Sequence, residues 1–166
     1  MNHVAAGNGV DTPASRCTFY RETCGLPAVV TSTGRISVAA RVVWAIRVSA
    51  SVGHSVRQDL RNRWRVEGPI VSHPRSATWS FLVEPDVPLS PSLIGPLFRA
   101  NVAVHRDGAE IALPSPADRP FTARHWVVAP RDKFRPSGSV VLAAISRCLP
   151  GRGIDLRLID TEWRGA

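Results

Sequence analysis

The stretch Arg41-Val42-Val43-Trp44-Ala45-Ile46-Arg47-Val48 decides the fold. Its residues are almost all β-branched or otherwise apolar, which predicts a strand near the centre of a sheet, covered on both faces. Arg41 begins this stretch, and Arg47 is the one charged residue among residues 42–48. The chain is therefore expected to build a sheet around residues 41–48, with one cation on its central strand.

A helix is expected directly after this strand. Ser49 or Ser51 can cap it, and it should reach about Arg63. Apolar residues at every fourth position predict a buried row of Val52, Val56, Leu60 and Trp64. The neighbouring row consists of Arg57, Arg61 and Arg65. These arginines are either ordinary solvated helix surface or a stripe that faces phosphate, and Arg41, Arg47, Arg63 and Arg75 close by favour the stripe.

The other elements follow from apolar runs and turn residues. Strands are expected at residues 26–31, 68–71, 78–83, 102–104, 110–113 and 124–128, a short helix at 93–99, and a last helix capped by Ser137. His73-Pro74-Arg75-Ser76 and Asp107-Gly108 are typical of hairpin turns. This order predicts an α+β domain with a mixed sheet flanked by helices.

The chain has 166 residues, of which 44% are hydrophobic, and this suits one domain with a core of its own. Residues 1–16 are small and polar and predict a disordered tail, residues 17–150 the domain, and residues 151–166 a C-terminal tail.

The formal net charge is +8, and Lys133 is the only lysine. Arginine presents a planar fork that holds phosphate through two hydrogen bonds, so the excess of arginine favours nucleic acid or a nucleotide as partner. A GC-rich genome would account for arginine in place of lysine, but not for the net excess.

Cys17, Cys24 and Cys148 are odd in number and contain no CxxC pair. They predict reduced thiols in a cytoplasmic protein and no zinc site. No apolar run is long enough to cross a membrane, so no membrane partner is expected.

Four segments, in this order, resemble the bifunctional DNA primase/polymerase family: residues 33–37, 42–47, 73–82 and 101–116. In that family a Thr-Gly-Arg turn precedes a buried strand that ends in two aspartates one residue apart, which hold divalent metals. The turn here is Thr33-Gly34-Arg35, and the two aspartate positions fall on Ala45 and Arg47. The resemblance covers roughly residues 24–130 and implies a primase/polymerase-like fold.

The later motifs of the family are also incomplete. Ser76 and Ala77 stand in for the two glycines of its phosphate-binding turn, and its histidine position falls on Trp79. The aspartate of its third motif falls on Ala103. The parts that do match here are Pro74, Phe81-Leu82, Asp107-Gly108, Pro114-Ser115 and Trp126.

These replacements predict a catalytically inactive relative. A two-metal site needs carboxylates to hold its ions, which alanine and arginine cannot do, and Arg47 would instead supply a cation where the family holds a metal. The remaining carboxylates Asp107, Glu110, Asp118 and Asp132 are assigned to turns, loops and a solvent face. We expect no catalytic residue, no metal site and no cofactor.

The resemblance and the charge together imply a nucleic-acid- or nucleotide-binding accessory protein of DNA replication, with DNA favoured over RNA. The expected phosphate- or nucleic-acid-binding residues are Arg35, Arg41, Arg47, Arg57, Arg61, Arg65, Arg75 and Trp79. Trp79 could stack a base or belong to the core. The alternative is a protein interaction module that docks to replication or transcription machinery, including RNA polymerase, without touching nucleic acid.

Overall fold

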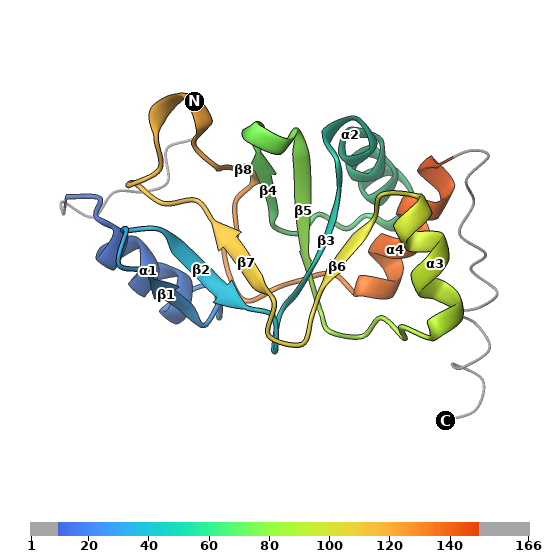
Figure 1. Ribbon diagram of the computed structural model, residues 1–166, viewed down its shortest axis with the longest axis horizontal. Coiled ribbons are helices and arrows are strands. Elements are labelled where there is room, and N and C mark those ends of the chain that lie inside the picture. The colour runs from blue at the N-terminus through green and yellow to red at the C-terminus, as the bar shows by residue number, and fades with distance from the viewer. Residues whose placement is uncertain (1–9, 150–166) are drawn as a thin grey trace.

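A computed structural model describes residues 10–149 as an α+β domain with two separate antiparallel sheets (Figure 1). The larger sheet has the order β6 (Ala103–His105), β3 (Trp44–Ser49), β5 (Thr78–Val83), β4 (Ile70–His73) and β8 (His125–Val128). The smaller sheet has the order β1 (Ala28–Val30), β2 (Ile36–Ala39) and β7 (Glu110–Leu113). The α+β class is confirmed, but the single mixed sheet is not: every pairing between these strands is antiparallel.

The 41–48 stretch forms an interior strand of the larger sheet, although this strand begins only at Trp44 and the middle strand of the five is β5. β3 lies between β5 and β6. Because side chains alternate along a strand, Ile46 and Val48 point to one face of the sheet, whereas Ala45 and Arg47 point to the other. Ile46 and Val48 are buried and Arg47 is exposed.

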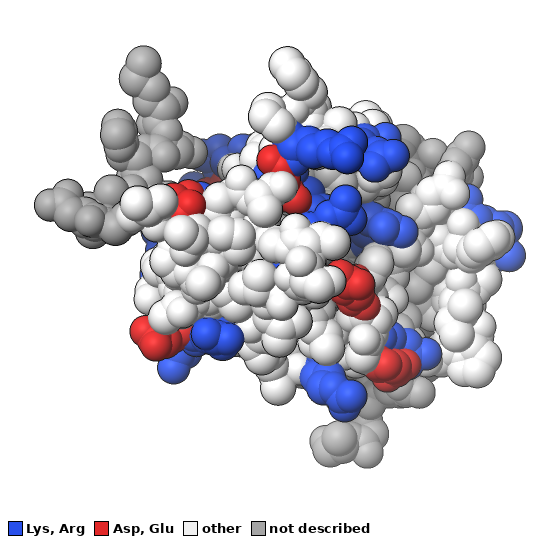
Figure 2. Space-filling model, turned by 60° about the vertical axis from the view of Figure 1, so that its left-hand side comes forward, with Lys and Arg blue, Asp and Glu red and all other residues white. Residues whose placement is uncertain are grey.

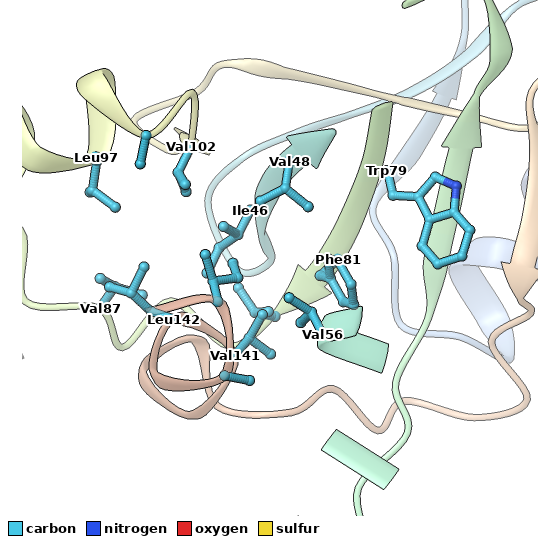
Figure 3. Close-up of a cluster of buried hydrophobic side chains, with 14 of the residues drawn as sticks. Ile46, Val48, Val56, Trp79, Phe81, Val87, Leu97, Val102, Val141 and Leu142 are labelled. Atoms are coloured by element: carbon cyan, nitrogen blue, oxygen red, sulfur yellow. The ribbon is translucent and has the colours of Figure 1, made fainter. Parts of the chain in front are cut away.

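Three helices cover the first face of the larger sheet: α2 (Ala50–Asp59), α3 (Pro91–Arg99) and α4 (Gly138–Cys148). Their buried side chains form one core with β3 and β5, in which Val56 and Val141 lie against Ile46 and Phe81 (Figure 3). The expected caps of two of these helices are confirmed, since Ser49 Oγ accepts from Val52 N–H at 3.4 Å and Ser137 Oγ accepts from Val140 N–H at 3.4 Å.

The helix after β3 differs from expectation at its end. A π-helical turn, Leu60–Trp64, continues α2, and Arg65 closes it in the left-handed region at φ 54°. Leu60 is buried, but Trp64 is 39% exposed, so the buried row stops one turn earlier than its sequence period predicts. The π turn adds a residue to the helical repeat and so shifts Trp64 away from the core.

A second core lies on the other face of the larger sheet. It joins Ala45, Val71 and Leu82 to the smaller sheet and to α1 (Pro13–Glu22). Tyr20 fixes the contact, because its hydroxyl donates to the Pro114 carbonyl at 2.9 Å and accepts from Trp126 Nε1 at 3.0 Å. The expected tail therefore ends sooner than residue 16: Thr12 caps α1, whereas residues 1–9 and 150–166 lie outside the described part.

The Asp107-Gly108 turn forms, but the hairpin does not. Both residues have positive φ, 54° and 84°, and Ala109 N–H donates to the Arg106 carbonyl at 2.9 Å. The flanking strands nevertheless belong to different sheets, since β6 pairs with β3 and β7 pairs with β2. The turn thus carries the chain from one sheet to the other. The hairpin of β4 and β5 around Pro74–Ser76 is confirmed.

Candidate functional site

A cleft of about 950 Å³ opens where the second core ends. β3, β4, β5 and β6 form its floor with the face that the helices do not cover, and the 33–35 turn, β7 and the 117–124 loop form its walls. A hydrogen bond joins the start of the 117–124 loop to the 33–35 turn: Ser115 Oγ, just before the loop, donates to the Gly34 carbonyl at 2.7 Å.

Strand register brings the three positions that the resemblance assigned to aspartates together. Arg47 lies opposite Ala103 on β6 and opposite Ser80 on β5, and Ala45 lies opposite His105. Ala45 and Arg47 both line the cleft. Among residues 10–149, no group of three or more His, Cys, Asp or Glu side chains could hold a metal ion.

The cleft is strongly basic. Its lining includes five arginines, Arg35, Arg47, Arg75, Arg119 and Arg124, and two acids, Glu110 and Asp118. Only Arg124 is neutralised in this lining, by Asp118 at 3.0 Å. The other four form no ion pair with any residue between 10 and 149. Figure 2 shows basic side chains gathered in the upper part of one face, with acidic side chains beside them.

Two histidines on the floor stay neutral. Burial, with Arg124 and Arg47 nearby, lowers the pKa of His73 to about 4. Burial and Arg47 also lower the pKa of His105, whose Nε2 is buried without a hydrogen-bond partner in the described part of the chain. His73 Nε2 lies 2.9 Å from Ser80 Oγ. At neutral pH the positive charge of the cleft therefore resides on its arginines.

The lowered pKa of His73 predicts a loss of stability in acid. The unfolded imidazole has a pKa near 6.5, so the unfolded state takes up the proton first as the pH falls. The contribution is complete above about pH 6.5 and is lost as the pH falls toward about 4. Because the ring is partly open to the cleft, the loss should be on the order of 1–2 kcal/mol.

Urea unfolding of the wild type, His73→Gln and the exposed-site control His125→Gln at about pH 7 and about pH 4.5 measures this loss. The wild type and H125Q should lose more free energy of unfolding than H73Q. Equal losses in all three proteins would show that His73 is not the group responsible.

Of the arginines expected from the sequence, Arg35, Arg47 and Arg75 line the cleft. The row of Arg57, Arg61 and Arg65 does not, because α2 and its π turn pack on the opposite face of the sheet. Arg57 is paired with Glu67 at 2.8 Å, and Arg61 lies 3.9 Å from the same carboxylate. Arg41 is exposed outside the cleft lining. The helix arginines therefore lie apart from the cleft, and their contact with phosphate stays a prediction.

Trp79 is also placed differently. It is 5% exposed in the helix-side core, with its ring centroid 4.3 Å from that of His54. Gly53 makes room for it, since a Cβ at that position would lie 2.7 Å from the indole. Alternation along β5 turns Ser80, not Trp79, toward the cleft. Trp79 is therefore a core residue, and the expectation of base stacking there is wrong.

The sequence did not point to Arg119, Arg124, His73, His105 or Phe121, all of which line the cleft. The close spacing of arginines around an aromatic residue in 119–124 was the available signal. This spacing alone could not indicate a site, because the loop is known to lie at the cleft only from tertiary contacts such as the Ser115–Gly34 hydrogen bond.

Comparisons with protein-family models, with curated proteins and with solved structures find no match for this chain. Within residues 10–149, every helix is too short or too polar to cross a membrane.

Proposed function

We propose that this domain is a catalytically inactive, primase/polymerase-like module that binds the phosphates of nucleic acid or of a nucleotide in the basic cleft, as an accessory protein of DNA replication. The observation that carries the proposal is the position of Arg47. It lies on the interior strand β3, at the floor of the cleft, in the position that the resemblance gives to a metal-binding aspartate.

The electrostatics support an anionic ligand. Among the described residues, four of the five arginines that line the cleft of about 950 Å³ have no carboxylate partner, and a cleft in which positive charges outnumber negative ones concentrates anions. Arginine forks match phosphate oxygens, and strand β3 fixes the backbone of Arg47 at the floor of the cleft. The neutral imidazoles and Ser80 add hydrogen-bonding groups without adding charge.

The experiment has two readouts on one highly purified preparation. With Mn²⁺ and all nucleotides, the protein should neither extend a primer nor make one, because Ala45, Arg47 and Ala103 cannot hold the two ions. It should bind single-stranded DNA with an affinity that falls steeply with salt, because each phosphate contact releases counterions.

Metal-dependent extension would contradict the inactive assignment. A protein that bound no DNA at low salt would favour the other candidate, docking to replication or transcription proteins.

A further inference from the structure

The 117–124 loop carries a phenyl ring that the fold does not use. Phe121 lies in the short 3₁₀ turn Pro120–Thr122 and is 99% exposed, yet it lines the same cleft as the arginines. A ring wholly in water contributes nothing to the core. The ring also lies between Arg119 and Arg124, two of the cleft arginines, in the sequence.

The exposure of Phe121 does not come from a loose loop. Arg124 Nη1 donates to Asp118 Oδ1 at 3.0 Å, and the Asp118 side chain is only 6% exposed. Asp118 Oδ2 accepts from the Ser115 backbone N–H at 3.3 Å, and Thr122 N–H donates to the Arg119 carbonyl at 3.1 Å. These bonds fix the backbone of the loop, so that the Phe121 ring projects from an anchored part of the cleft wall.

We infer that Phe121 is a stacking platform for an unpaired base, and that the ligand of the cleft is therefore a single strand of nucleic acid. This inference rests on the proposed phosphate-binding function. Every base offers a flat face to an aromatic ring, and such stacking combines with a basic groove in proteins that bind single strands without sequence preference. In a duplex the faces are occupied by neighbouring base pairs. A chain of phosphates, moreover, suits arginines spread from the 33–35 turn to the 74–76 turn better than a single nucleotide does.

The test compares two strands of about 15 nucleotides with the same backbone charge, an oligothymidylate and an abasic strand. The wild-type chain of 166 residues should bind the oligothymidylate about tenfold more tightly than the abasic strand. Phe121→Ala should remove this preference by weakening only the oligothymidylate, whereas Phe121→Trp should retain it. The matched control is Phe98→Ala, which removes an 81% exposed phenyl ring from α3, outside the cleft, and should change neither affinity.

The failures are distinguishable. If wild type binds both strands equally, or if F121A retains the preference for bases, phosphate binding stands and the stacking role of Phe121 falls. Binding of dTTP as tight as that of the oligothymidylate would overturn the assignment of a strand. If neither strand binds, the proposed function fails and this inference fails with it.

Discussion

Replacing Arg47 with glutamate should weaken the binding of single-stranded DNA by about 100-fold at low salt. Two unit charges 4 Å apart interact by about 4 kcal/mol at an effective dielectric constant of 20, so reversing one charge beside a phosphate can remove about 2–3 kcal/mol after partial screening. The fold should survive this change. Arg47 is exposed, and it forms no ion pair with the described residues. Fluorescence anisotropy with a labelled oligothymidylate measures the affinity.

Arg65→Glu is the matched control. It makes the same change of charge at an exposed residue outside the cleft, after the π turn on the helix side of the sheet. It should reduce affinity only a few-fold, through the net charge of the protein. If R65E weakened binding as much as R47E, binding would depend on diffuse charge and not on the cleft.

Trp79→Ala should destabilise the domain by about 3–5 kcal/mol, the usual cost of removing a large buried aromatic side chain. The indole packs against Gly53 of α2 within the helix-side core, so its removal leaves a large cavity there. Because a small domain is stable by only about 5–15 kcal/mol, W79A is expected to be partly unfolded at modest urea concentrations. Chemical unfolding followed by circular dichroism measures the loss.

Trp64→Ala serves as the comparison for Trp79→Ala. Trp64 is 39% exposed and carries the Arg147 guanidinium 5.6 Å above its ring, so its removal should cost much less than that of Trp79. Where W79A remains folded at low temperature, it should bind DNA within a few-fold of the wild type. A large loss of affinity in folded W79A, with its stability unchanged, would restore the base-stacking role that the structure argues against.

Local patterns predicted the local structure well. The run around Ile46, the serine caps of α2 and α4, and the β4–β5 hairpin each depend on residues close together in the chain, and each is present. Short strands were harder. β2 has only four residues, and its alternation is hidden by the adjoining Thr33-Gly34 turn. β2 is the middle strand of the smaller sheet, where it pairs with both β1 and β7.

Which strands are neighbours could not be predicted from turn chemistry. Asp107-Gly108 specifies two positive φ values, and the structure has them, but this geometry does not dictate whether the flanking strands pair with each other. Here β6 pairs with β3 and β7 pairs with β2, and the second core forms between the two sheets. The cleft is a consequence of this separation.

Only part of the candidate site could be predicted, because the sequence does not show which distant segments are neighbours. Arg47 was singled out as the charge in an apolar run and, with Arg35, by the resemblance, whereas Arg75 came from its place in a turn; all three line the cleft. The sequence could not show whether the arginine row on α2 borders the cleft. The helical period indicates which face of the helix is apolar, but it does not indicate which side of the sheet the helix covers. Arg119 and Arg124 depend on contacts between residues more than eighty positions apart, such as Ser115 with Gly34.

The central claim is that binding uses the cleft and not the helix, and two triple variants of equal charge test it most directly. One replaces Arg35, Arg47 and Arg75 with glutamine; the other replaces Arg57, Arg61 and Arg65 with glutamine. The measurement is the slope of log affinity against log salt for single-stranded DNA. The cleft triple should lower the magnitude of this slope by about 2, at about 0.7 per phosphate contact, and the helix triple should leave it nearly unchanged. Equal changes in both triples, or a change in the helix triple alone, would contradict the account.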